Sequence, residues 1–391
     1  MAKMLRALVV AVALLVCPVR AGDGNGKVKV FILAGQSNME GLGHVRTLDH
    51  LGQDAEYGRL LKKIRNGDGS WVTRDDVFVY FRDGKTVGQL TVGFGANKEF
   101  IGPELMFGMV LGDHFKDPVL LVKTAWGGKD LYCDFRPPSA GKLPYPVPPE
   151  KLKERGGDKA VGEFYRKMVA DTRDCLDNMG KYFPQLKGKE HEIVGFVWFQ
   201  GWNEMFPMQG CPFEQLMSDY PHTYVKMIQD LEKEFGLKSL PSAVGEMGVD
   251  GERAGGRTPP LRKAQAAIAD QPELKGKVRF VRTVQYWDPK LDELNASRGA
   301  IEREQRGKLK DKVAAEVKEK LEGKDPKKQR EILDNALGQA VRNTPEYKAW
   351  QTEWDKIASH WECHYYGSGK VYSLIGYGLG EAMKDLLKQG T

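Results

Sequence analysis

Short apolar runs alternate with helical patterns along most of this chain. Six runs rich in branched and aromatic residues are predicted to be strands, at residues 27–34, 77–81, 119–124, 192–199, 242–245 and 278–283. Between most of them, apolar residues recur at the three- and four-residue spacing of a helix. Strands that alternate with helices pair in parallel through right-handed crossovers. The pattern therefore predicts an α/β fold, with helices on both sides of a central parallel sheet.

Four helices are indicated by the same periodicity, at residues 103–114, 164–179, 222–235 and 371–387. Pro103 opens the first of them, because proline suits the first helical turn. A proline-rich connection at residues 134–157 and a strongly charged segment at about 291–355 interrupt the α/β pattern. We expect the charged segment to be an inserted helical hairpin, solvated on most of its surface.

A serine stands where the first predicted strand turns into a helix. The strand ends in the run Gly35-Gln36-Ser37-Asn38-Met39. This position places the hydroxyl of Ser37 at the carboxyl edge of the sheet, where open α/β folds bind their ligands. A serine at such a turn can equally be a helix cap. Two later segments, residues 201–204 and the region of His364, favour the interpretation as a nucleophile.

Residues 35–39 resemble the first sequence block of the SGNH hydrolases, in the branch of sialate O-acetylesterases and acetylxylan esterases. Gly201-Trp202-Asn203-Glu204 is similar to that family's Gly-x-Asn-Asp block, and the strand at 120–128 ends in a comparable glycine pair. The resemblance covers about residues 27–290 and 359–388. It implies a flavodoxin-like three-layer α/β/α sandwich, to which the charged helical segment at 291–355 is an insertion.

The resemblance also implies ester hydrolysis by a serine nucleophile. Ser37 attacks, and the oxyanion is stabilised by the backbone N–H of Ser37, by that of Gly127 or Gly128, and by the Asn203 amide. This set of donors leaves no need for a metal, and no cofactor is predicted. The implied substrate is an acetylated carbohydrate.

The general base is expected to be His364, which lies in a glycine-rich loop before the last helix. His360, four residues earlier, is its competitor. The family's Asp-x-x-His block is only half present, because Trp361 occupies the position of the aspartate. Glu362 could reach the imidazole from two residues away, Asp355 is a more distant candidate, and a backbone carbonyl could replace the carboxylate altogether.

Residues beside these motifs are candidates for binding the sugar. Trp126 and Trp202 flank the presumed oxyanion donors, so they could stack on a pyranose ring, although core packing explains them equally well. Gln36, Gln200 and Glu204 are the polar candidates for substrate contacts.

The first 21 residues have the pattern of a secretory signal peptide. Lys3 and Arg6 precede an apolar stretch at residues 7–16, and cleavage is expected after Ala21. This predicts a secreted or periplasmic protein whose esterase domain occupies residues 22–391. No later segment approaches the roughly 20 apolar residues that a membrane span needs.

Four cysteines remain beyond the predicted signal, at positions 133, 175, 211 and 363. In an oxidising compartment at least one disulfide is expected, although Cys175 lies in a helical pattern where a buried thiol is favoured. The net charge is +6, and much of the Lys and Arg is concentrated between residues 298 and 330, where it is mixed with Glu and Asp. This composition does not indicate nucleic-acid binding.

These observations predict a serine esterase that removes O-acetyl groups from carbohydrates. One alternative is a catalytically silent carbohydrate-binding protein on the same scaffold, which the missing aspartate before His364 favours. A lipase for long acyl chains is disfavoured, because no apolar lid is evident in the sequence.

Overall fold

The computed structural model describes residues 26–389 apart from 146 and 209. Its centre is a seven-stranded sheet with the order β4-β3-β6-β1-β7-β8-β9. The strands are β1 Val28–Gly35, β3 Val77–Phe81, β4 Thr86–Gln89, β6 Val119–Ala125, β7 His191–Phe199, β8 Ser242–Gly245 and β9 Val278–Val281. All neighbours pair in parallel except β3 and β4, which form an antiparallel hairpin at one edge.

The topology has its switch point at β1. The chain passes from β1 to β6 on one side and later crosses to β7 on the other, so the strands β6-β1-β7-β8-β9 have the order of a flavodoxin-like sheet. The loops that follow β6, β1 and β7 diverge at the carboxyl ends of these three strands. Open α/β sheets bind ligands in the crevice that forms there.

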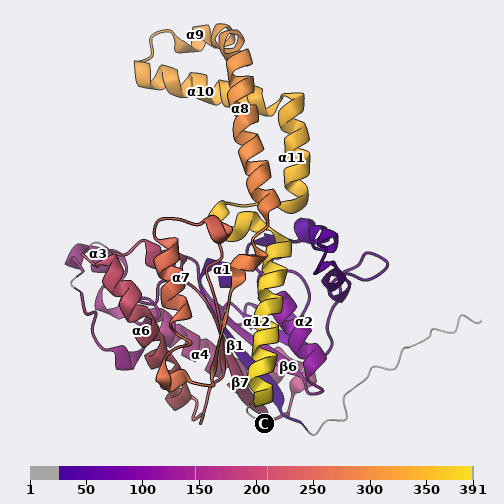
Figure 1. Ribbon diagram of the computed structural model, residues 1–391, viewed down its shortest axis with the longest axis vertical. Helices are drawn as coiled ribbons and strands as arrows, with labels where there is room; N and C mark the ends of the chain where they lie inside the picture. The colour runs from indigo at the N-terminus through magenta and orange to yellow at the C-terminus, as the bar shows by residue number, and fades with distance from the viewer. Residues whose placement is uncertain (1–25, 146, 209, 390–391) are drawn as a thin grey trace, which may run out of the picture.

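Helices cover both faces of the sheet and make three layers (Figure 1). On one face lie α2 Glu104–His114 and the C-terminal α12 Gly369–Gln389, which pack on each other. The other face carries α4 Glu163–Asp177, α6 Phe213–Glu234 and α7 Thr258–Ala266. The fold class predicted from the sequence, a three-layer sandwich around a parallel sheet, is confirmed.

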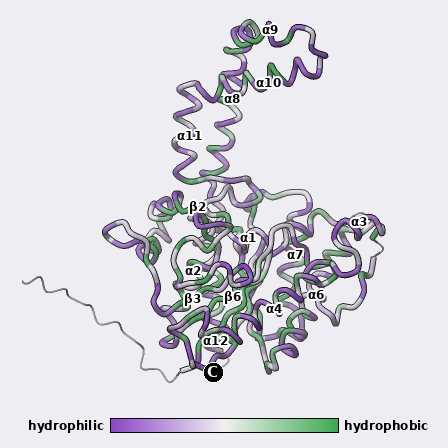
Figure 2. Tube along the Cα trace, turned by 180° about the vertical axis from the view of Figure 1, so that it is seen from behind, coloured by the Kyte–Doolittle hydropathy of each residue, from purple (hydrophilic) through white to green (hydrophobic). Residues whose placement is uncertain are grey.

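The central strands are buried on both faces, as continuous apolar runs in a parallel sheet require. In β1, Val30 belongs to the cluster under α4, where it joins Phe78, Val122 and Cys175. The next residue, Phe31, points to the opposite face and makes an edge-to-face contact with Phe107 of α2. Figure 2 shows the hydrophobic residues gathered along the sheet and its covering helices.

All six predicted strands are present, and their boundaries shift by at most two residues. The short strand β4 was not predicted, nor was the small pair β2 Gly43–His44 and β5 Phe100–Ile101. Helix α6 begins at Phe213, nine residues before the predicted start, and contains Pro221. The short polar-flanked strands and a helix that continues through a proline lack the periodicity on which sequence reasoning depends.

The charged segment forms an arm that projects from the α/β body (Figure 1). It consists of α8 Pro289–Glu316, α9 Lys318–Leu321, α10 Pro326–Arg342 and α11 Pro345–Ile357. Helix α8 packs against α10 in its outer part and against α11 near the body. The insertion is thus helical and charged as predicted, but it has three long helices in place of a simple hairpin.

The expected disulfide is absent among the described residues, where Cys133, Cys175, Cys211 and Cys363 are all free thiols. Three of them are buried, and burial raises the pKa of the Cys133 thiol to about 12. Within residues 26–389, as far as the structure describes them, the sheet core holds the fold without a disulfide. No helix in the described part of the chain is long and apolar enough to cross a membrane. The predicted signal peptide lies outside the described residues.

One ion pair is completely buried beside the central strands. The ammonium of Lys123 on β6 lies 2.7 Å from the carboxylate of Glu104 at the start of α2, and neither side chain is exposed to solvent. Lys123 also donates to the backbone carbonyls of Glu40 and Phe94, at 2.7 Å each. The second oxygen of Glu104 accepts from the N–H of Gly102. The pair therefore joins β6, the start of α2, the end of the short helix Ser37–Glu40 and the loops at Phe94 and Gly102.

We expect Lys123→Met to lower the free energy of unfolding by about 3–5 kcal/mol, because it leaves the buried carboxylate of Glu104 without its counter-charge. Chemical denaturation followed by circular dichroism measures this. Lys63→Met is the control, since Lys63 forms a half-exposed pair with Asp113 that is worth at most about 1 kcal/mol. Equal losses in the two variants would contradict the importance assigned to the buried pair.

Candidate active site

Three loops meet at the carboxyl edge of the sheet. They follow β1, β6 and β7, which are neighbours, and they carry Ser37, Gly127 with Gly128, and Asn203. The fourth contribution comes from residues 359–368, which precede α12 and bring His364 to the same edge. The sequence-predicted residues thus assemble from four separate parts of the chain.

Ser37 begins the short helix α1 Ser37–Glu40 immediately after β1. The turn requires glycine at position 35, because a Cβ there would lie 2.2 Å from the carbonyl oxygen of Phe199 on β7. This close approach lets β1 and β7 remain paired to their last residues, Gly35 and Phe199. As a result, Ser37 and the loop after β7 lie side by side.

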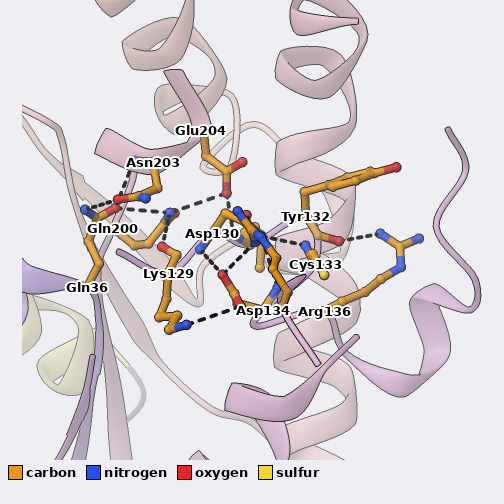
Figure 3. Close-up of polar contacts among 12 residues, drawn as sticks. Gln36, Lys129, Asp130, Tyr132, Cys133, Asp134, Arg136, Gln200, Asn203 and Glu204 are labelled. Atoms are coloured by element: carbon orange, nitrogen blue, oxygen red, sulfur yellow. Dashed lines mark hydrogen bonds and ion pairs between the residues drawn. The ribbon is translucent and has the colours of Figure 1, made fainter. Parts of the chain in front are cut away.

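Gln36 is buried under the site and fixes the loop after β7 (Figure 3). Its side-chain amide oxygen accepts from the backbone N–H groups of Gly201 and Asn203, at 3.1 and 3.2 Å. Its amide nitrogen donates to the side-chain oxygen of Asn203 at 3.0 Å. Because the oxygen of the Asn203 amide is engaged in this way, its NH2 group is left to face the site.

The other two polar candidates, Gln200 and Glu204, extend this buried network. Gln200 donates to Gln36 and to Glu204, and it accepts from the hydroxyl of Tyr220 at 2.9 Å. The carboxyl of Glu204 accepts from the backbone N–H of Leu131 as well. Gln36, Gln200 and Glu204 were expected to contact substrate, but their polar groups are turned inward and satisfied by one another. They support the loop that carries Asn203.

Glu204 is ionised with difficulty at this position. Burial, followed by the nearby carboxylate of Asp130, raises its pKa to about 8. A protonated carboxyl at neutral pH suits a site that offers it few compensating charges.

Gly127 and Gly128 are exposed at the end of β6, opposite Ser37. A Cβ on Gly127 would lie 3.9 Å from the Cβ of Ser37, and one on Gly128 would lie 3.9 Å from the amide nitrogen of Asn203. Gly128 has φ +73°, a conformation that favours glycine. The nearest atom to a Cβ on Gly127 would be a carboxylate oxygen of Glu40, at 3.5 Å, so this exposed glycine is not tightly packed beside the serine.

The imidazole of His364 lies against the serine, with Nε2 3.0 Å from Oγ of Ser37. The loop reaches this position through a sharp turn, in which Tyr365 and Tyr366 both adopt left-handed conformations with φ +51°. Burial, with a smaller contribution from the neighbouring His360, lowers the pKa of His364 to about 4. The ring is therefore neutral at ordinary pH.

Asn38, which was not predicted to act in the site, connects the helix of Ser37 to the loop of His364. Its amide nitrogen donates to the backbone carbonyl of Cys363 at 3.1 Å, and its oxygen accepts from the hydroxyl of Tyr372 at 2.7 Å. Asn38 is fully buried. It connects the helix of the nucleophile to the loop of His364, which explains structurally the asparagine after the serine.

The partner of His364 on its far side is His360. The two Nδ1 atoms are 3.0 Å apart. The structure corrects the expectation for Glu362, whose carboxyl faces Asp250; this contact, together with burial, raises its pKa to about 7. In the described part of the chain no hydrogen bond joins Glu362 to His364. The other acidic candidate, Asp355, forms an ion pair with Arg46.

Aromatic side chains border the site on both sides. Trp126 is half-buried and packs against Phe164, with ring centres 5.2 Å apart. Trp202 is also half-buried and contacts the exposed ring of Phe206. Trp361, in the position where the family has aspartate, is 75% exposed. Trp202 with Phe206 therefore offers apolar surface next to the loop of Asn203.

A family model described as carbohydrate esterase, sialic acid-specific acetylesterase, matches residues 27–292. The chain belongs to this family. It is accordingly a carbohydrate esterase, a carboxylic ester hydrolase. The match ends close to the start of the arm, and His364 lies beyond it. No curated protein sequence matches the chain.

Three solved structures are similar to this carbohydrate esterase at low sequence identity. A protein from Arabidopsis thaliana shares 18% identity over 66% of this chain and 86% of its own, with a TM-score of 0.40. A carbohydrate acetylesterase from Xanthomonas citri shares 14% over 65% of this chain, with a TM-score of 0.38, and the alignment spans 49% of its length. NanS shares 14% over 65% of this chain and 77% of its own, with a TM-score of 0.39.

Proposed function

We propose that this carbohydrate esterase hydrolyses O-acetyl esters on sugars, with Ser37 as nucleophile and His364 as general base. The observation that carries the proposal is the 3.0 Å contact between Nε2 of His364 and Oγ of Ser37. These residues are 327 positions apart in the sequence. A nucleophile in hydrogen-bond reach of a base is the arrangement that serine acyl transfer needs.

In the proposed first step, Oγ of Ser37 attacks the acetyl carbonyl carbon and its proton passes to Nε2 of His364. The oxyanion of the tetrahedral intermediate accepts hydrogen bonds from the N–H of Ser37, the N–H of Gly127 or Gly128, and the amide of Asn203. The intermediate collapses when His364 returns the proton to the sugar oxygen, which leaves as a hydroxyl. A water molecule activated by His364 then hydrolyses the acetyl-serine and releases acetate.

An acetylated carbohydrate fits this chemistry and the family to which the chain belongs. The exposed glycines beside Ser37 give a small acyl group access to its hydroxyl, and the ring surfaces of Trp202 and Phe206 could stack against a pyranose. The alternative of a silent binding protein has less support, because a base already in contact with the serine serves no purpose in binding alone. Cleavage of the predicted signal peptide and secretion remain part of the proposal.

We expect Ser37→Ala to abolish hydrolysis of a chromogenic acetyl ester while the protein stays folded, because the half-exposed hydroxyl contributes little to the core. A fluorophosphonate reagent should label the unmodified protein at Ser37, and peptide mass spectrometry locates the adduct. Ser139→Ala, at an exposed position of the short 3-10 helix Pro138–Ala140, is the control. An adduct on another serine, or full activity of Ser37→Ala, would refute the proposed nucleophile.

Asn203→Ala should lower kcat by about 10² to 10³ with a smaller effect on KM, since its amide is proposed to bind the oxyanion and not the ground state. Steady-state kinetics with an acetyl ester separates the two constants, and Asn66→Ala at an exposed turn is the control. Unchanged activity together with a large fall in melting temperature would make Asn203 a structural residue.

The activity should persist at unusually low pH. Because the pKa of His364 is about 4, the base stays mostly neutral until the pH approaches that value, and kcat/KM should fall to half its plateau near pH 4. Rates measured between pH 3.5 and 8, with aliquots returned to neutral pH, separate this titration from acid unfolding. A midpoint near the ordinary histidine value of 6.5 would contradict the prediction.

A further inference from the structure

Trp361 stands where the usual serine triad has its aspartate. His364 nevertheless has a hydrogen-bond partner on the side of its ring away from Ser37. The atom that faces Nδ1 of His364 is Nδ1 of His360, at 3.0 Å, and the two ring planes are inclined by 59°. Two unprotonated nitrogens at this distance would repel each other. One of the two rings must therefore donate a proton to the other.

The direction of this hydrogen bond follows from the role of His364. Its Nε2 can take the proton of Ser37 only if it is unprotonated, so a neutral His364 carries its proton on Nδ1. That N–H donates to Nδ1 of His360, which in turn carries its proton on Nε2. We infer that His360 is the positioning residue of this site: it selects the tautomer and orientation of His364 in place of a carboxylate. The inference rests on the proposed function.

The local backbone holds His360 in this position. The N–H groups of Ser359 and His360 both donate to the carbonyl of Tyr366, at 2.7 and 2.9 Å. Gly367 lies so close that a Cβ on it would be 2.9 Å from the Cβ of His360, and its φ of +68° favours glycine. The chain thus folds back so that His360 meets His364.

The carboxylates that could have taken this role are engaged elsewhere. Glu362 faces Asp250, and Asp355 pairs with Arg46. A neutral imidazole accepts a weaker hydrogen bond than a carboxylate and stabilises the imidazolium less. The arrangement orients the base while giving it less electrostatic support than a Ser-His-Asp triad provides.

The first test is kinetic. His360→Ala should lower kcat for an acetyl ester by about 10- to 100-fold with KM nearly unchanged, because an unoriented base still accepts the proton. His360→Asn and His360→Asp should recover part of the loss, since each places an oxygen acceptor near the former Nδ1. His114→Ala, an exposed histidine at the end of α2, is the matched control. Full activity of His360→Ala, or a larger loss in Glu362→Gln, would overturn the inference.

The second test is independent of catalysis. Nitrogen-15 NMR of the imidazoles in the intact protein should find His364 protonated at Nδ1 and His360 at Nε2. In His360→Ala the preference of His364 for this tautomer should weaken, and in His360→Asn it should return. The reverse tautomers in the unmodified protein would overturn the inference, whatever the activity. If Ser37→Ala is inactive and the histidines have the expected tautomers, both the proposed nucleophile and the role of His360 are supported. Activity that survives in Ser37→Ala refutes only Ser37 as the nucleophile.

Discussion

The arrangement of the site depends on the buried ammonium group of Lys123, which lies in the sheet away from solvent. Lys123 lies on β6, between the strand that leads to Ser37 and the edge of the sheet, and its ammonium is satisfied by Glu104 and two backbone carbonyls. One of those carbonyls belongs to Glu40, the last residue of α1. Burying a charge in this way is costly unless every hydrogen bond is made. The helix of the nucleophile, the loop at Phe94 and the start of α2 are therefore held in one geometry.

Above this pair, amide side chains position the reacting groups. Gln36 directs the Asn203 amide from below, and Asn38 connects the nucleophile helix to the loop of His364. An amide suits both tasks, because it donates and accepts at once without carrying a charge into the core. Ser37 is thus flanked in sequence by two residues whose side chains hold two other parts of the site, the loop of Asn203 and the loop of His364. The short motif at residues 36–38 organises most of the site by itself.

The sequence was sufficient for the sheet and for the residues that the motifs name. Continuous apolar strands and helical spacing are local signals, and they located the six parallel strands, with Ser37 at the end of the first. Asn203 and His364 were predicted from motifs that resemble a known family. The burial of Gln200 and Glu204 could not be predicted, because it depends on Tyr220 and Leu131, which are distant in sequence. The contact of His360 with His364 arises from two tyrosines in left-handed conformations, for which residue type gives no signal. Short-range patterns define elements, whereas the direction of a polar side chain is decided by partners far along the chain.

The arm joins the body immediately before the loop of His364. Tyr366, two residues after His364, contacts both helices of the arm that lie next to the body, through Asn295 of α8 and Trp354 of α11. At the end of the arm next to the body, Trp350 of α11 donates to the carbonyl of Leu294 on α8. Since these helices hold the two ends of the insertion together, the loop of His364 avoids the chain entropy that a long unstructured connection would cost. An insertion built in this way can lengthen or shorten at its distal end during evolution while the anchoring of the histidine stays the same.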